Sequence, residues 1–170
     1  TTLEQRAPVK AKLKELGLTP VGFGVVGGLG KDEESARKVF EFCKDMGIGI
    51  VVAEPLETKE AYDIIEKLVK EFDIKMAIHN HPKKPLDRSY KYWDPEYVLS
   101  WVKDRDPRMG SCCDIGHFVR SGIKPVDAIR ILKGRILDSH VKDLDQFGVR
   151  EAKDKIWGTG VSDLPAVLNL

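Results

Sequence analysis

The chain has 170 residues and a formal net charge of +1, because 28 lysines and arginines are balanced by 27 aspartates and glutamates. This balance gives no electrostatic case for binding to nucleic acid or to a membrane surface. No run approaches about 18 consecutive apolar residues, so the sequence contains no candidate transmembrane helix, and no signal peptide is visible. With 42% hydrophobic residues, the composition is typical of a globular α/β domain with a core of ordinary size.

The three cysteines indicate a reducing compartment. Cys43 falls in a helical pattern, and Cys112 and Cys113 are neighbours in a strand pattern. Because neighbouring strand residues point to opposite faces, this pair suits neither a disulfide nor a zinc site. We interpret all three as small core residues and expect a cytoplasmic protein. The chain begins Thr-Thr-Leu rather than with Met, so a periplasmic location is the alternative if a leader has been removed.

Helices and apolar strands alternate along the chain. Helices are predicted at residues 3–16, 33–46, 59–72, 95–103 and 125–132, and a last helix begins at residue 164. Strands are predicted at residues 21–26, 48–53, 74–81, 109–114 and 136–141, followed by a long loop to Gly160. The first helix has an apolar stripe made by Val9, Leu13 and Leu16.

This alternation predicts a parallel sheet covered by helices on both faces. Two architectures fit the pattern. An open doubly wound sheet can be built from five strands, whereas a (β/α)8 barrel normally needs eight strands and about 200 residues or more. Because the predicted elements open on a helix and stop in or just after one, we expect part of a (β/α)8 barrel. It would form a single, incomplete domain over residues 1–170 that lacks the first strands and the last strand.

Polar residues that can bind metal gather where the predicted strands end. The four histidines are all expected at strand ends and none in a helix, and two carboxylates and a lysine share these positions. The set is Glu54, His79, His81, Asp114, His117, His140 and Lys142. The carboxyl ends of parallel strands form one mouth, where such folds place their sites. Imidazole and carboxylate without thiolate suit Mn²⁺, Co²⁺, Zn²⁺ or Fe²⁺, so a divalent metal site is predicted, with a metal-free hydrogen-bonded cluster as the alternative.

Several of these residues admit two roles. Two-residue spacing places His79 beside His81, and His140 beside Lys142, on the same strand face. His81 either binds substrate or contacts a metal-ligating residue, or else it only caps its strand. His117 either binds the metal or orients the carboxylate of Asp114. Lys142 contacts a substrate oxygen or phosphate, or else it is an ordinary solvated lysine.

Two glycine motifs and one aromatic cluster have weaker implications. Residues 22–27 match G-x-G-x-x-G, but the glycines fall inside a predicted strand, so we do not interpret them as a dinucleotide fingerprint. Residues 158–160, Gly-Thr-Gly, precede a helix expected to be capped by Ser162 and form either a phosphate site or a plain turn. The aromatic residues of the insertion at 82–93 cover a pocket or pack on neighbours: Tyr90, Tyr92 and Trp93.

Five short motifs together resemble one family. They are Ala-Ile-His-Asn-His-Pro at 77–82, Asp-Ile-Gly-His at 114–117, Arg-Ser-Gly-Ile-Lys-Pro at 120–125, His-Val-Lys-Asp at 140–143 and Trp-Gly-Thr-Gly at 157–160. In this order, from about residue 48 to the end, they resemble the xylose isomerase-like sugar phosphate isomerase/epimerase superfamily. The resemblance implies a (β/α)8 barrel with a divalent metal at its mouth.

By this resemblance, Asp114 and His140 match two metal ligands of the family. His79 stands where the family usually has a glutamate that serves as ligand and base, and Glu54 would take over one of those roles. The implied metal ligands are therefore Glu54, His79, Asp114 and His140. A further family glutamate on the last strand has no counterpart in the chain, and the first one or two βα units are absent.

The expected function is a metal-dependent isomerase or epimerase acting on a sugar or sugar phosphate through an enediolate. Glu54 or His81 would remove a proton beside a carbonyl, and Lys142 and the metal would stabilise the oxyanion. His81, His117 and Lys142 are the candidate catalytic residues, and the partners are a small sugar and, as an open option, a second copy of the chain. A 3-keto-glycoside lyase or hydratase and a non-catalytic sugar-binding barrel are alternatives, and an endonuclease IV-like phosphodiesterase is disfavoured because it needs more histidines and a basic groove.

Overall fold

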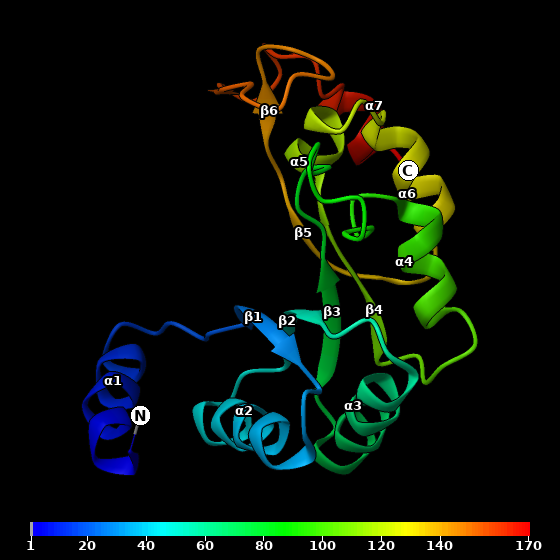
Figure 1. The fold of residues 1–170 in the computed structure, drawn as a ribbon. Helices are drawn as coiled ribbons and strands as arrows, with labels where there is room; N and C mark the ends of the chain where they lie inside the picture. The colour runs from blue at the N-terminus through cyan, green and yellow to red at the C-terminus, as the bar shows by residue number, and fades with distance from the viewer. Residues whose placement is uncertain (1) are drawn as a thin grey trace. The chain divides into compact units, whose positions relative to one another are not determined.

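The computed structural model describes residues 2–170, which divide into two compact units after Lys75 (Figure 1). The first unit contains α1 (Leu3–Glu15), β1 (Gly22–Leu29), α2 (Glu33–Met46), β2 (Ile50–Pro55) and α3 (Lys59–Phe72). Strands β1 and β2 pair in parallel, and α2 packs against α3 and against both strands. Glu54 lies near the carboxyl end of β2 and is half-buried.

Local signals in the sequence explain where the helices of the first unit begin and end. The side chain of Asp32 accepts a hydrogen bond from the backbone N of Ser35 and caps α2, and Gly47 ends the same helix in the left-handed region at φ 71°. Thr58 caps α3 in the same way. Both helices begin and end where the sequence predicts, at residues 33–46 and 59–72.

Helix α1 is attached by charges rather than by its apolar stripe. None of its residues, all of which the structure describes, is buried, and Val9 is 50% exposed. Arg6 and Lys10 instead form ion pairs with Asp45 of α2, at 3.3 and 2.9 Å. The predicted helix is confirmed, but its stripe does not pack into the core.

The second unit holds the remaining elements around a parallel sheet of three strands. These elements are β3 (Lys75–His79), α4 (Pro95–Val102), β4 (Met109–Asp114), α5 (Ile115–Arg120), α6 (Pro125–Leu132), β5 (Ile136–His140), β6 (Asp143–Leu144), β7 (Asp154–Lys155) and α7 (Leu164–Leu168). All six residues of β4 are buried between β3 and β5. In the register of the sheet, His79 lies opposite Cys112, and Asp114 lies opposite His140. The polar ends of the three strands therefore meet.

Several predicted strand boundaries are wrong, among them those of β2, predicted at residues 48–53 and found at Ile50–Pro55. β1 continues through Gly27 and Gly28 to Leu29, because this strand accepts glycine where the sequence suggests a loop. β3 ends at His79 and β5 at His140, so His81 and Lys142 follow their strands rather than end them. The predicted loop before Gly160 contains the short antiparallel pair β6 and β7.

The prediction that no histidine lies in a helix is also wrong. His117 is on α5, a six-residue helix that follows β4 directly. Its sequence contains Gly116 and is too short to show a helical period. Among the helices of residues 2–170, none has the length and apolar character needed to cross a membrane.

Candidate metal centre

The centre is built around Asp114, a fully buried carboxylate at the end of β4. Its backbone is fixed by Asn80, whose side-chain amide donates to the Asp114 carbonyl at 3.0 Å and accepts from the Asp114 N–H at 2.8 Å. Its Oδ1 accepts the backbone N–H of His117 at 3.0 Å and so caps α5. Oδ2 is left facing the imidazoles of the neighbouring strands.

Three donor atoms form a closed triangle at this point. The Nε2 of His79 lies 3.1 Å from the Nδ1 of His140, and the Oδ2 of Asp114 lies 3.6 Å from the former and 3.4 Å from the latter. Ligands on a tetrahedral zinc ion with bonds of about 2.0–2.1 Å are about 3.3 Å apart. The spacing and the two-histidine, one-carboxylate chemistry both fit a divalent transition metal.

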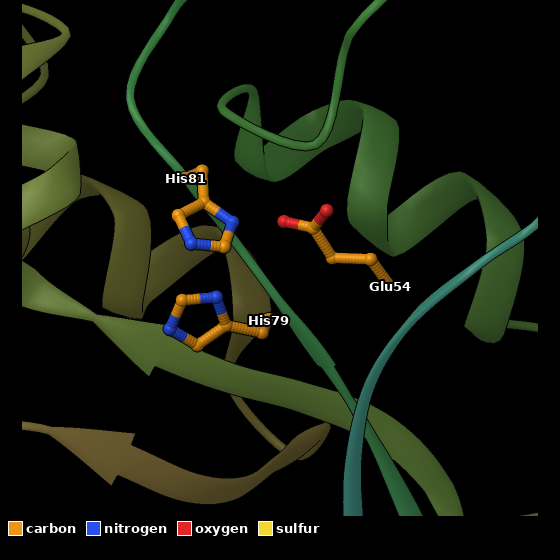
Figure 2. A group of neighbouring side chains, drawn as sticks. All are labelled: Glu54, His79 and His81. Carbon is orange, nitrogen blue, oxygen red and sulfur yellow. The ribbon is translucent and has the colours of Figure 1, made fainter. Parts of the chain in front are cut away.

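The other ring nitrogen of His79, Nδ1, lies outside this triangle. The residue is buried, and its Nδ1 has no hydrogen-bond partner among residues 2–170. A buried ring nitrogen without a partner is costly. Figure 2 shows the rings of His79 and His81 on the same side of the chain, and their centroids are 4.5 Å apart. The two rings therefore lie close together, although β3 ends at His79 and His81 follows the strand.

His117 supports the carboxylate of Asp114. Arg120 Nη1 lies 3.3 Å from His117 Nδ1 and donates to it, which leaves the proton of the neutral ring on Nε2, 3.5 Å from Asp114 Oδ2. Burial lowers the pKa of His117 to about 3, against the opposing effect of Asp114, so the ring is neutral near pH 7. Of its two predicted roles, the geometry favours orienting Asp114.

Lys142 approaches the same carboxylate. Its Nζ lies 2.6 Å from Asp114 Oδ2, and its stem crosses Gly116, where an added Cβ would lie 2.9 Å from the Lys142 Cβ. Burial alone would raise the pKa of Asp114, but its contacts with His79 and His117 and the ammonium of Lys142 hold it well below its usual value. Asp114 is therefore an anion at neutral pH and is able to bind a cation.

The predicted site residues are thus brought together in part. His79, Asp114, His117, His140 and Lys142 converge within the second unit, and the ring of His81 lies 5.2 Å from that of His117. Glu54, the third side chain drawn in Figure 2, belongs to β2 in the first unit and stays a prediction from the sequence. The sequence-based reasoning missed Asn80 and Arg120, although both stand inside the motifs quoted above.

A second group of potential metal ligands lies on β4 and β5. Cys112 pairs with Asp138 in the register of β4 and β5, and the donor atoms of these two residues and His140 lie within 4.8 Å of one another. Burial, followed by the nearby charge of Asp138, raises the pKa of the Cys112 thiol. The thiol is therefore protonated at neutral pH in the absence of metal.

The backbone N–H groups of the turn at residues 158–160 already donate to a side chain of the protein. The backbone N–H groups of Gly158, Gly160 and Ser162 donate to the carboxylate of Asp143 at 2.9, 2.9 and 3.0 Å. They cannot also bind a phosphate, so the plain-turn interpretation is right. The predicted cap is wrong too, because Asp163 and not Ser162 caps α7.

The glycines of residues 22–27 lie inside β1, and α2 begins only at Glu33. The interpretation that they are not a dinucleotide fingerprint is confirmed, since that fingerprint needs a helix opening on its last glycine.

Comparison with known proteins identifies the fold. The chain matches the family described as Xylose isomerase-like TIM barrel over residues 2–170. It is 34% identical to an uncharacterized protein from Parabacteroides distasonis ATCC 8503, with a TM-score of 0.70, covering 99% of this chain and 63% of that one. A D-tagatose 3-epimerase-like protein is 19% identical with a TM-score of 0.73, covering 98% of this chain and 71% of that one. The IOLI protein, crystallised with a zinc atom, is 20% identical with a TM-score of 0.64, covering 95% and 67%.

No curated protein sequence matches the chain. The chain spans 63% of the length of its relative from Parabacteroides distasonis, and its fold is a partial barrel. The predicted fold class is confirmed over the open doubly wound alternative. The chain belongs to the xylose isomerase-like TIM barrel family.

Proposed function

We propose that this chain carries the metal site of a sugar or sugar phosphate isomerase or epimerase that depends on a divalent metal ion. The observation that supports this most is the triangle of His79 Nε2, Asp114 Oδ2 and His140 Nδ1, with sides of 3.1–3.6 Å. The structural similarity to a D-tagatose 3-epimerase-like protein and to a zinc-containing protein supports the same function.

Different residues would remove the proton and stabilise the negative charge that results. When bound, the metal would supply Lewis acidity to a carbonyl and a neighbouring hydroxyl of the sugar. His81, or Glu54 from β2, would remove the proton from the carbon that bears this hydroxyl and give an enediolate. The ammonium of Lys142, held 2.6 Å from Asp114, would donate to the oxygen that becomes negative. Return of the proton to the former carbonyl carbon gives isomerisation, and its return to the original carbon from the opposite face gives epimerisation.

His117 and Arg120 would keep this arrangement in one protonation state. Because His117 is neutral and directs Nε2–H at Asp114, the carboxylate stays ionised and fixed in orientation. Arg120 is itself fixed by donating to the Ala152 carbonyl, at 3.1 Å from Nε and 2.8 Å from Nη2. The residue that orients Asp114 through His117 is therefore held at the end of α5.

A lyase or hydratase for 3-keto-glycosides is the second candidate, favoured by the histidine at the end of β3. The first step would be the same proton removal, but a leaving group on the next carbon would depart and leave a double bond. The two candidates therefore differ in product, since only the second forms an alkene or its hydrate.

Proton exchange tests the proposed chemistry. The protein is incubated with D-tagatose, D-fructose or a 3-keto-glycoside in D₂O with Mn²⁺, Co²⁺ or Zn²⁺, and deuterium at the carbon beside the carbonyl is followed by NMR. We expect incorporation that requires metal, is abolished by Asp114→Ala and persists in Asp127→Asn, an exposed control on α6. Incorporation that Asp114→Ala leaves unchanged would refute the mechanism, and binding without exchange would favour a sugar-binding barrel.

A further inference from the structure

A pocket separate from the metal centre lies within the insertion that follows His81. It has a volume of 590 Å³ and is lined by residues between Lys83 and Tyr97, all in the second unit. Its size falls in the range of small-molecule sites, about 300–1,000 Å³. The proposed proton transfer uses none of its residues.

The lining is strongly basic. Four of its residues are cations and two are carboxylates, whereas the whole chain has a net charge of only +1: Lys83, Lys84, Arg88 and Lys91 against Asp87 and Asp94. Both carboxylates already have partners. Asp87 accepts from the N–H and hydroxyl of Ser89, and Asp94 accepts from the N–H of Glu96 and so caps α4.

Three of the cations are available to a ligand. Within residues 2–170, the side chains of Lys83, Arg88 and Lys91 form no ion pair with any carboxylate. The ammonium of Lys83 lies 4.6 Å from the ring centroid of Trp93, and that of Lys91 lies 5.4 Å from the ring of Tyr97. A cation–π contact at an exposed site is weaker than a charge-assisted hydrogen bond, so each ammonium can turn to an anion at a net gain.

The pocket is fixed in place by buried aromatic rings. Tyr90 is 7% exposed and Tyr92 2%, and their rings are 6.1 Å apart. Tyr92 in turn lies 6.0 Å from Tyr97 on α4. Of the two roles expected for these aromatic residues, Tyr92 packs on its neighbours, while Tyr90 and Trp93 line the pocket. The lysines are therefore presented by a packed segment.

The same segment connects the pocket to the metal centre. The hydroxyl of Tyr90 accepts the backbone N–H of His81 at 2.8 Å. Lys83 is two residues further on, where its N–H donates to Ser121 Oγ at 3.0 Å and its carbonyl accepts from Arg150 Nη1 at 2.7 Å. Lys83, the first cation of the pocket, therefore follows His81, a proposed base, by two residues in the same segment.

We propose that this pocket binds the anionic end of the substrate, a phosphate or a carboxylate, while the carbonyl end of the same sugar lies at the histidines. This inference rests on the function proposed above and narrows its substrate class to phosphorylated sugars and sugar acids. Lysine suits the role, because its compact, rotatable ammonium binds phosphate and carboxylate oxygens as a point charge.

Three sugars that differ only at the sixth carbon test this inference. Glucose 6-phosphate, glucuronate and glucose are titrated into the protein by calorimetry at low salt. We expect a charged sugar to bind roughly tenfold more tightly than glucose or better, the gain typical of one charge-assisted contact, and the preference to fall as salt is added. Tighter binding of glucose 6-phosphate alone, or of glucuronate alone, identifies the group that is recognised.

Two double variants provide the comparison. Lys83→Gln with Lys91→Gln should abolish the preference, and Lys133→Gln with Lys155→Gln should keep it, because the latter removes two exposed lysines of the same unit from outside the pocket. Lys83→Arg with Lys91→Arg keeps the charges and should keep the preference, which separates lost charge from lost folding. Charged sugars that bind no more tightly than glucose, or not at all, would overturn the inference, as would a preference that survives in the glutamine variant.

The titrations in Asp114→Ala separate this pocket from the metal. The preference should persist there, because the lysines act without the ligand set. In the unmodified protein, a preference for charged sugars without deuterium exchange would mean that only the proposed function fails. Exchange without any preference would mean that only the pocket inference fails.

Discussion

Asp143 offers a quantitative test of how the loop after β5 is held. This carboxylate is 1% exposed, and each of its oxygens accepts two backbone N–H groups. Oδ2 accepts those of Gly158 and Gly160 at 2.9 Å, and Oδ1 accepts those of Ser162 at 3.0 Å and Leu144 at 3.1 Å. Asp143→Asn keeps the shape of the side chain but replaces one acceptor by an NH₂ donor.

Whichever oxygen is replaced, two backbone donors lose their acceptor and face another donor. A hydrogen bond to a charged group contributes about 1.5–3 kcal/mol, and an unsatisfied buried donor adds to the loss. We therefore expect the free energy of unfolding to fall by about 3–5 kcal/mol. Equilibrium unfolding in urea at pH 7 measures this, with Asp127→Asn as an exposed control. A loss below about 1 kcal/mol, the net value of one ordinary hydrogen bond, would refute this account of the loop.

The same carboxylate predicts a pH dependence. Burial would raise the pKa of Asp143, but the N–H groups of Ser162, Gly160 and Gly158 lower it below its ordinary value. A lowered pKa in the folded state means that the stabilisation is complete above the unfolded pKa of about 3.9 and is lost as pH falls through the folded pKa. The difference in stability between the unmodified protein and Asp143→Asn should be constant from pH 5 to 8 and shrink below pH 4. A difference that grows on acidification would contradict the assigned sign.

Three further predictions concern the neighbourhood of the metal centre. Lys142→Met, measured in urea with a chelator present, should lower the free energy of unfolding by about 3–5 kcal/mol, because the buried Asp114 loses its closest cation; an unchanged stability would show that the pair contributes nothing. Gly116→Ala should cost about 1–3 kcal/mol, because its Cβ would lie 2.9 Å from the Lys142 Cβ; a neutral effect in the same assay would mean that the lysine stem moves aside freely. Burial raises the pKa of Cys43 and Cys113 to about 11, so Ellman's reagent at pH 8 should label these thiols only in urea, and rapid labelling of the folded protein would contradict their burial.

The helices that the sequence predicts without error carry explicit end signals. Asp32 and Thr58 cap α2 and α3, and Pro125 occupies the first position of α6. Such signals act over three or four residues, so they can be found without knowing the fold. Helix α5 has no such independence, because its cap is Asp114, the last residue of a buried strand. A six-residue helix whose cap is the last residue of a buried strand cannot be recognised from periodicity.

The residues of the candidate site likewise fall into those that the sequence predicts and those that it does not. The convergence of His79, Asp114 and His140 follows from parallel register, since each ends a strand and the strands are neighbours. Asn80 and Arg120 were missed because their roles depend on contacts across the chain. The partners of Asn80 are the backbone groups of Asp114, 34 residues away, and Arg120 donates to Ala152, 32 residues away. Neither separation leaves a signal in the local sequence.

The metal content of the purified protein tests the central claim most directly. After dialysis, inductively coupled plasma mass spectrometry should find about one divalent metal ion per chain, as expected for one site with histidine and carboxylate ligands. Asp114→Ala should lose the ion, because it removes one corner of the donor triangle, and Asp127→Ala, on the exposed surface of α6, should retain it. Metal that stays bound in Asp114→Ala, or folded unmodified protein that binds no metal even when Zn²⁺ and Mn²⁺ are supplied, would contradict the account.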